Sequence, residues 1–413
     1  MLVPTWVVET WNRMNEYYPW LKERSLAAGQ DSHPFSETNL PLLLTAEDLE
    51  TYYYDVESPL PRVMQVSDSL RRYLTSGTSS GRRKQIFYTT GDEAAYLDIK
   101  LEVFQHILQD TAEKTAMSDM GTGHAEATAL EVFQRLGYSV ESISFSLPIS
   151  QHLERLQAVK PQILYTMPSI LERLIQEASN PGNLGIQQVI LVGEMASPFW
   201  VSRIAEQLNL SDHQITDTYG SIEVGTIAYY SHIHERYILT DGLWAEGVES
   251  ERLGQDFSPL PEGEQVLVLT SAWREAFPVV RYVTYDVVRD LRPIQVDGEL
   301  RQSFKCIVKR IGPDLKHGEK ISIYDIESNV YKHIASARVT LALAGNTLQV
   351  YLEDANLTAE IMHSVQQDIE QCIPEIQQMI ISGLLERIEV IAGHGPTEDR
   401  DSNRVKGKRL WYT

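Results

Sequence analysis

Between residues 150 and 225, segments with helical and strand-like patterns alternate at short intervals. The short, mostly apolar segments "PQILYT", "QQVILVGE" and "QITDTYG" are typical of buried strands. The segments between them have the apolar spacing of helices, and Ser169 with Glu172 predicts a capping box at one helix start. Alternation of this kind predicts a parallel sheet with helices on its faces. Ligands bind beyond the carboxyl ends of such strands, so the loops "LYTMPS", "LVGEMAS" and "DTYGSIE" are the candidates for chemistry.

The rest of the chain divides into a helical N-terminal part, a β-rich part and a small C-terminal module. The segment "LPLLLTAEDLETYYYD" predicts a helix capped by Thr45, and residues 263–290 read as strands and turns. Beyond residue 310, "RVTLALAGNTLQVYLED" predicts a hairpin, followed by an amphipathic helix and another strand. We therefore expect an α/β fold with a large N-terminal domain, residues 1–309, containing parallel sheets and a β portion. The Gly and Pro of "KRIGPD" mark its boundary with a small, mobile α+β domain, residues 310–413.

Charge and cysteine content exclude several classes of protein. With 36 Lys and Arg against 57 Asp and Glu, the net charge of −21 disfavours nucleic acid or an anionic membrane as the main partner. The 2 cysteines form no CxxC pair, which argues against a disulfide framework or a structural zinc site and favours a reducing compartment. The sequence contains neither a signal-peptide pattern nor a long apolar span, so we expect a cytoplasmic protein.

The segment "YLTSGTSSGRRKQIFYTT", residues 73–90, gathers small hydroxyl residues and glycines directly before three basic residues. It fails the P-loop pattern, because Gly77 and Gly81 lie one residue too close and Arg82 follows the second glycine. A dinucleotide-binding GxGxxG pattern is also absent, since "GTGHAE" has Glu in the third glycine position. Two interpretations of the segment stay open: a solvated surface turn, or a loop whose backbone N–H groups and hydroxyls surround phosphates.

Four further segments support the phosphate interpretation. "TSGTSSGRRK" resembles the phosphate loop of the adenylate-forming superfamily, which comprises acyl- and aryl-CoA ligases, adenylation domains and luciferases. "DTYGSIEVG" resembles its aromatic-Gly-x-x-Glu motif, and "PVVRYVTYDVV" its Arg-Tyr-x-Thr-Gly-Asp motif. "RIGPDLKHGEKISIYDIE" resembles the hinge motif, and "VKGKRL" the terminal Lys-x-x-Arg. The motifs occur in the family's order, from residue 73 to residue 409.

Within that superfamily the chain is most similar to phenylacetate–CoA ligase and its relatives, in its length, its "LVGEMAS" loop and its N-terminal "P-x-x-T-x-x-D-L"-like segment. The extra residue in "SGTSSGRRK" looks more like the loop of plant acyl-acid amido synthetases, which leaves the fate of the adenylate open. A second departure is Tyr285, which stands where the family usually has glycine. Tyrosine lacks glycine's backbone freedom, so the turn before Asp286 is expected to differ.

The resemblance implies ATP and Mg²⁺ as cofactors and assigns a role to individual residues. Lys84, or alternatively Arg83, would neutralise phosphate charge. Glu223 would bind Mg²⁺, and Asp286 would accept the ribose hydroxyls. The remaining nucleotide-binding candidates are Ser76, Gly77, Thr78, Ser79 and Gly81 around the phosphates, Gly193, Glu194 and Tyr219 at the adenine, Thr218 and Gly220 near the α-phosphate, and Arg310 at the ribose. For each of them, a purely structural role in a turn, in the core or on the surface is the alternative.

Lys406 is the candidate for the lysine that reaches the carboxylate and the α-phosphate during adenylation, with Lys408 and a merely basic tail as alternatives. In the family the acid pocket lies between "SDMGTGHAEAT" and the two loops after the strands, which gives the candidates Asp119, Gly121, His124, Met167 and Met195. Asp119 and His124 are polar where a plain aryl acid needs apolar walls. They would recognise an amino or hydroxyl substituent, or simply face solvent.

The resemblance therefore predicts activation of an aryl or aminoaryl carboxylic acid as its adenylate, with release of pyrophosphate, and transfer to a thiol. CoA is the expected acceptor, which makes the protein an acid–thiol ligase. The alternatives are loading of a carrier protein, direct formation of an amide, or a non-catalytic protein that only binds nucleotide. The identity of the acid, the acceptor and the oligomeric state are not determined by the sequence.

Overall fold

The computed structural model describes residues 3–30, 35–36, 39–54, 56, 59–60, 70–75, 84–108, 114–120, 124–144, 147–254, 257, 259–312, 321–396 and 410–412. The chain folds into two compact units, each assembled from separate segments. Unit 1 contains residues 1–110, 123–137 and 218–306, and unit 2 contains residues 111–122, 138–217 and 307–413. Strands β7 (Ile215–Ser221) and β15 (Cys306–Arg310) lead along the chain from one unit into the other.

Unit 1 combines helices with antiparallel sheets. Its helices are α1 (Thr5–Tyr17), α2 (Pro19–Ala27), α3 (Ala46–Leu49), the π-helical turn Glu50–Tyr54, α5 (Thr90–Ile107), α6 (His124–Arg135) and the 3₁₀ turn Ser250–Leu253. Its strands are β1 (Arg71–Leu74), β2 (Gln85–Tyr88), β8 (Gly225–Ser231), β9 (Arg236–Leu239), β10 (Leu243–Val248), β11 (Glu264–Ser271), β12 (Tyr282–Arg289), β13 (Arg292–Val296) and β14 (Glu299–Phe304). The prediction of strands at 263–290 is therefore confirmed.

The strands of unit 1 pair antiparallel in the orders β1-β2, β10-β11-β12 and β13-β14-β9-β8, with the end of β7 beside β8. Helix α1 packs on this part through Trp11, whose indole N–H donates to the Thr270 hydroxyl at 3.2 Å. The predicted cap at Thr45 is confirmed: its hydroxyl accepts from the Asp48 amide, and the Asp48 carboxylate accepts from the Thr45 amide. A capping box of this kind satisfies amide groups that the helix itself leaves unpaired.

Unit 2 contains the predicted parallel sheet. Its strands β4 (Ser139–Ser142), β3 (Thr115–Ser118), β5 (Ile163–Thr166) and β6 (Gln188–Val192) lie side by side in that order, and each neighbouring pair is parallel. The connecting helices are α7 (Ile149–Val159), α8 (Pro168–Glu177) and α9 (Pro198–Leu208), with 3₁₀ turns at Pro181–Asn183 and Asp212–Gln214. The strands and helices expected between residues 150 and 225 are all present.

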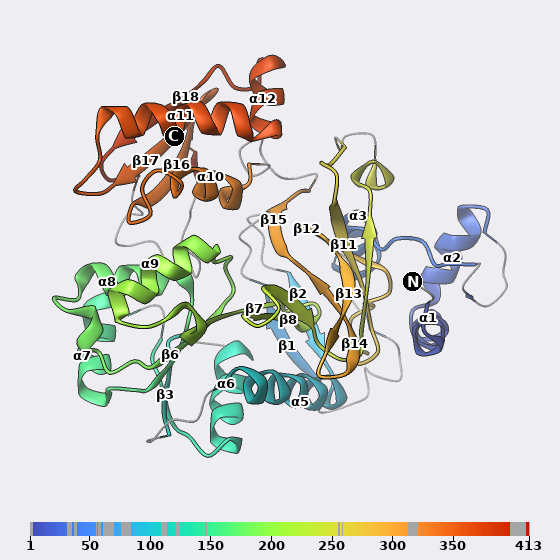
Figure 1. Ribbon diagram of the computed structural model, residues 1–413. Coiled ribbons are helices and arrows are strands. Elements are labelled where there is room, and N and C mark those ends of the chain that lie inside the picture. The colour runs from blue at the N-terminus through green and yellow to red at the C-terminus, as the bar shows by residue number, and fades with distance from the viewer. Residues whose placement is uncertain are drawn as a thin grey trace. The chain divides into compact units, whose positions relative to one another are not determined.

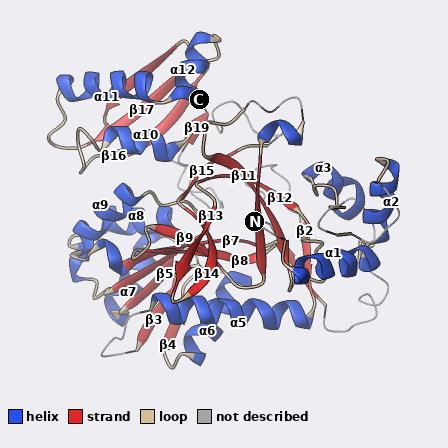
Figure 2. Cartoon of the chain, turned by 45° about the vertical axis from the view of Figure 1, so that its right-hand side comes forward, coloured by secondary structure: helices blue, strands red, loops and turns tan. Residues whose placement is uncertain are grey.

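The C-terminal part of unit 2 has a sheet and a hydrophobic core of its own. Its strands run in the order β18 (Arg387–Ala392), β17 (Thr347–Glu353), β16 (Arg338–Ala344) and β19 (Leu410–Tyr412), with helices α10 (Ile323–Val330), α11 (Ala359–Cys372) and α12 (Pro374–Ile381). Figures 1 and 2 show α10 and α11 beside β16 and β17, and Val350, Val365 and Ile369 lie in their shared core. The predicted hairpin is confirmed, with Gly345 in the left-handed region at φ +56°. An α/β fold with a smaller C-terminal α+β part is thus confirmed, while the boundary at 309/310 and the mobility of that part stay predictions.

Candidate functional site

The predicted phosphate loop connects the two strands of a β-hairpin in unit 1. Strands β1 and β2 pair as far as Leu74 and Gln85, and Thr75 and Lys84 continue the pairing through two hydrogen bonds of 2.9 Å. The ammonium group of Lys84 forms an ion pair with Glu50 and lies 4.7 Å from the centre of the Tyr54 ring. The loop residues Ser76, Gly77, Thr78, Ser79 and Gly81 lie outside the described residues.

The aromatic-Gly-x-x-Glu motif covers the end of β7 and the turn into β8. Thr218 is buried, Tyr219 is half-buried, and Gly220 faces Thr226 in the pairing of the two strands. A Cβ atom on Gly220 would lie 2.7 Å from the carbonyl oxygen of Gly225, so only glycine fits there. Glu223 occupies the turn itself and is half-buried. Burial raises the pKa of the Tyr54 phenol, and the negative charge of Glu223 raises it further. The Glu223 carboxylate and the Lys84 ammonium group therefore both act on Tyr54.

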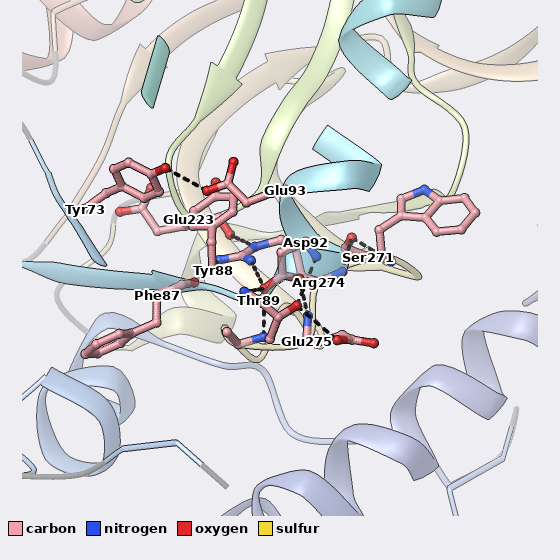
Figure 3. A network of polar contacts seen from close by, with 12 residues as sticks. Tyr73, Phe87, Tyr88, Thr89, Asp92, Glu93, Glu223, Ser271, Arg274 and Glu275 are labelled. Carbon is pink, nitrogen blue, oxygen red and sulfur yellow. Dashed lines mark hydrogen bonds and ion pairs between the residues drawn. The ribbon is translucent and has the colours of Figure 1, made fainter. Parts of the chain in front are cut away.

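A buried arginine binds the backbone of the turn that contains Glu223 (Figure 3). The guanidinium of Arg274 donates to the backbone carbonyls of Glu223 at 2.9 Å and Phe87 at 3.0 Å. Its Nη1 lies 2.6 Å from the carboxylate of Asp92, and its centre lies 3.9 Å from the centre of the Tyr88 ring. Asp92 in turn accepts hydrogen bonds from the backbone amides that follow Arg274. The arrangement joins the end of β2, the start of α5 and the turn of Glu223.

Tyr88 fixes the same turn at a second point. Its hydroxyl donates to the carbonyl of Ile222 at 2.6 Å, one residue before the carbonyl that Arg274 binds. Hydrogen bonds therefore hold two consecutive carbonyls of the turn, which restrains the backbone from which the Glu223 side chain projects. Sequence reasoning missed Arg274, Asp92 and Tyr88, because they belong to no recognisable motif and come together only through folding.

The two predicted nucleotide contacts Tyr219 and Asp286 lie together in unit 1. The Tyr219 hydroxyl donates to the Asp286 carboxylate at 2.5 Å. The backbone amide of Asp286 donates to the hydroxyl of Thr284 at 3.1 Å, and that hydroxyl donates to the carbonyl of Leu267 at 2.8 Å. The carboxylate is thus bound by a side chain of β7, and the backbone that carries it is held by the side chain of Thr284. Residues that the sequence separates by 67 positions form one polar group.

In unit 2 the loops after β5 and β6 come together, as the parallel sheet predicts. The Glu194 carboxylate accepts from the Ser169 amide at 2.8 Å and from the Ser169 hydroxyl at 2.9 Å. Gly193 has φ +81°, Met167 is buried and Met195 is half-buried. The predicted capping box of Ser169 with Glu172 is wrong, because helix α8 starts at Pro168 after Met167, and neither residue caps it through its side chain. Instead, Glu194 from the neighbouring loop binds the first turn of α8, where a negative charge is favourable.

Glu172 does not cap α8 and instead binds side chains farther along the chain. Its carboxylate accepts from the Trp200 indole at 2.7 Å and from the Arg203 guanidinium at 2.6 Å. The pattern Ser-x-x-Glu at a helix start was a reasonable signal for a cap. Packing of α9 against α8 gave Glu172 partners that local sequence does not reveal.

Asp119 follows β3 and is fully buried. Its carboxylate contacts the imidazole of His152 of α7, itself 1% exposed, and accepts from the Thr166 hydroxyl at 3.5 Å. Burial raises the pKa of the Asp119 carboxyl, and the contact with His152 opposes that rise. His152 was not a sequence candidate; it lies in an amphipathic helix, where a single histidine gives no signal. Of the other acid-pocket candidates, Gly121 lies outside the described residues, and for His124 the structure describes the backbone at the start of α6 alone.

The remaining candidates are Arg310 and the two lysines near the end of the sequence. Arg310 ends β15 and is exposed, and Lys406, with its alternative Lys408, lies outside the described residues. Among the described residues no group of three or more His, Cys, Asp or Glu side chains could hold a metal ion alone. A single carboxylate such as Glu223 is enough where substrate phosphates supply the other oxygen ligands, as is usual for Mg²⁺. No described helix has the length and apolar character that a membrane span requires.

Two comparisons by sequence agree with each other. Residues 316–394 match the family described as the fumarate–diaminopropanoate ligase C-terminal domain. Over 386 residues the chain is 34% identical to fumarate–(S)-2,3-diaminopropanoate ligase from Enterobacter agglomerans, covering 93% of this chain and 94% of that protein. The likeness extends over nearly the whole length of both chains.

The fold is similar to that of solved acid-activating enzymes. A crystal structure of 2-hydroxyisobutyryl-CoA ligase in the postadenylation state, in complex with 2-HIB-AMP, matches with a TM-score of 0.71 at 14% identity, covering 98% of this chain and 87% of that one. The open conformation of the same enzyme, in complex with 2-HIB-AMP and CoA, matches with a TM-score of 0.63 at 14% identity, covering 98% and 90% of the two chains. At this identity the likeness concerns the fold.

Proposed function

Because the chain belongs to the adenylate-forming ligase superfamily, and within it to the family of fumarate–(S)-2,3-diaminopropanoate ligase, we propose that it activates a short dicarboxylic acid with ATP and joins it to an amine. The proposal rests on the 34% identity, over 93% of the chain, to a ligase named for fumarate and (S)-2,3-diaminopropanoate. The first is a dicarboxylic acid, and the second is an amino acid that carries amino groups. Of the acceptors that the sequence left open, this relative favours the amine.

The proposed reaction has two steps. A carboxylate oxygen of the acid attacks the α-phosphorus of ATP, the bond from that phosphorus to the bridging oxygen breaks, and pyrophosphate leaves. The amine nitrogen then attacks the acyl carbon of the adenylate, AMP leaves with its oxygen, and the nitrogen loses one proton. Neither step requires a covalent bond to the protein, so the protein contributes alignment and charge neutralisation.

Side chains of unit 1 would supply the principal contacts to the nucleotide. Asp286 would accept the ribose hydroxyls and Tyr219 would lie against the adenine, which agrees with their hydrogen bond at 2.5 Å. Glu223 would hold Mg²⁺ together with phosphate oxygens, in a turn fixed by Arg274. Lys84 would exchange Glu50 for a phosphate. The further proposed contacts are Ser76, Gly77, Thr78, Ser79, Gly81, Thr218, Gly220, Gly193, Glu194, Arg310 and the adenylation lysine Lys406.

The acid would bind near Asp119, Gly121, His124, Met167 and Met195. The buried pair of Asp119 with His152 agrees better with a supporting role for Asp119 than with direct contact to the acid, because Asp119 has 0% exposure. An aryl or aminoaryl acid transferred to CoA, the expectation from the motifs alone, is the competing assignment. Its support is the resemblance to phenylacetate–CoA ligases.

The test is a two-stage assay on the full chain. Exchange of labelled pyrophosphate into ATP is measured first with fumarate and other short dicarboxylates, and in parallel with aryl and aminoaryl acids. The active acid is then offered (S)-2,3-diaminopropanoate, other amino acids, CoA and a phosphopantetheinylated carrier, and products are identified by mass spectrometry.

We expect exchange with a dicarboxylate and an amide as product. Exchange with aryl acids alone, or a thioester formed faster than any amide, would establish the competing assignment. Nucleotide binding without exchange for any acid would leave a binding protein and contradict both.

A further inference from the structure

Asp286 lies on a bulge of strand β12. Val287 pairs with Val266 and Val283 pairs with Val268, so that Leu267 alone faces the three residues from Thr284 to Asp286. Bulges bend a strand and redirect its side chains, and they are common beside active sites. Here the bulge turns Asp286 toward the Tyr219 hydroxyl.

The bulge keeps the backbone conformation of a glycine although tyrosine occupies its centre. Tyr285 has φ +62°, in the left-handed region that non-glycine residues rarely adopt. Tyrosine thus occupies a conformation that glycine adopts without steric cost, while the expectation that the turn differs from that of the family stays a prediction. Such a conformation costs on the order of 1 kcal/mol for an L-residue and persists only where the surrounding structure stabilises it.

A contact with the N-terminal segment supplies that stabilisation. The backbone amide of Ala46, the first residue of α3, donates to the Tyr285 hydroxyl at 3.1 Å. The segment before it is itself fixed: Leu44 exchanges hydrogen bonds of 2.9 and 3.0 Å with the backbone of Arg281 and Val283. The side chain of Tyr285 thus reaches from the bulge to a point 239 residues away in the sequence.

We propose that Tyr285 is a positioning residue, which fixes the ribose-binding carboxylate of Asp286 by tying its bulge to the start of helix α3. The inference rests on the proposed function, since it takes Asp286 as the ribose contact. Glycine has no side chain that could hold the bulge in one conformation. Tyr285 has one, and its hydroxyl anchors the bulge to a second segment of the chain.

The test is equilibrium binding of ATP and of 2′,3′-dideoxy-ATP, which lacks both ribose hydroxyls, to the full chain. Tyr285→Phe removes the hydroxyl and Ala46→Pro removes the amide donor. Proline is favoured at the first helical position, and the extended Thr45 before it, with φ −93° and ψ 169°, accommodates it. Each variant should weaken ATP binding about twofold to tenfold, the effect of one net hydrogen bond, and leave dideoxy-ATP binding unchanged.

The preference for ATP over the dideoxy analogue should therefore fall by the same factor, and the double variant should be no worse than either single one. Tyr351→Phe, which removes a hydroxyl donating to Gln349 at 2.9 Å in the C-terminal part, is the matched control and should keep the preference. Tyr285→Gly restores the family's residue and relieves the strained backbone. It should also lose preference for the ribose; equal or tighter ATP binding would overturn the proposal.

Asp286→Ala separates the two levels of the argument. Loss of the ribose preference in Asp286→Ala but not in Tyr285→Phe would overturn the role of Tyr285 and leave Asp286 as the ribose contact. An unchanged preference in Asp286→Ala would instead remove the ribose contact from the proposed function. Equal weakening of ATP and dideoxy-ATP in Tyr285→Phe would indicate a general structural role and also contradict the proposal.

Discussion

The buried Lys100 should make the free energy of unfolding depend on pH, and the substitution Lys100→Met should remove that dependence. It lies on α5 with 2% of its surface exposed, its ammonium 3.3 Å from the Thr128 hydroxyl and 5.6 Å from the centre of the Tyr96 ring. Burial lowers the pKa of Lys100 from 10.5 to about 7. The folded chain therefore loses this proton at a lower pH than the unfolded chain does.

The sign and size of the effect follow from this difference. Between pH 7 and 10.5 the unfolded chain holds a proton that the folded chain lacks, so the free energy of unfolding rises with pH. The slope is about 1.4 kcal/mol per pH unit, which gives about 2 kcal/mol between pH 7.5 and pH 9. Met has a similar length and no proton to lose, so Lys100→Met removes this contribution. Its other effects, including the lost contact with Thr128, do not depend on pH.

The assay is urea unfolding of the wild type and of Lys100→Met at about pH 7.5 and about pH 9. The two proteins can be compared where the free energy of unfolding falls with urea concentration at the same slope. The variant should gain stability relative to the wild type at the lower pH, and the difference should shift by about 2 kcal/mol toward the wild type at the higher pH. Lys22→Met, at an exposed position of α2, is the control and should give a constant difference. Parallel pH curves for the wild type and Lys100→Met would refute the reasoning.

Three further substitutions test the proposed nucleotide site and the buried arginine contact beside it. Tyr88→Phe removes the 2.6 Å hydrogen bond to the turn of the proposed magnesium carboxylate, and should raise the Mg²⁺ concentration needed for pyrophosphate exchange about twofold to tenfold. Tyr73→Phe, at the neighbouring ring, should leave the required Mg²⁺ concentration unchanged. An equal rise in both variants would show that the effect of Tyr88→Phe is not specific to its hydrogen bond. Asp92→Asn leaves a buried guanidinium without its carboxylate and should lower the free energy of unfolding by about 3–5 kcal/mol, whereas the exposed Asp98→Asn should cost under about 1 kcal/mol, both measured in urea. Lys406→Ala should abolish adenylate formation while ATP binding is kept, and normal exchange in that variant would remove this lysine from the reaction.

The sequence alone determined the features that depend on short-range patterns. The apolar strands and helices between residues 150 and 225, the cap at Thr45 and the hairpin around Gly345 are all present as predicted. Helical and strand periodicity and capping involve residues a few positions apart, so they can be recognised without tertiary structure. The motifs also predicted that Tyr219 and Asp286 serve one nucleotide site. A hydrogen bond joins the two side chains, while their binding of nucleotide stays a prediction.

The tertiary structure decided which side chains meet across long separations. Nothing in the local sequence indicates that Arg274 binds the carbonyl of Glu223, that Glu194 rather than Glu172 binds the start of α8, or that Lys100 is buried. The left-handed conformation of Tyr285 is the clearest case, since the local cost of that conformation argues against it. Hydrogen bonds and packing from distant segments outweigh a local preference of about 1 kcal/mol, and such partners are known only after the chain has folded.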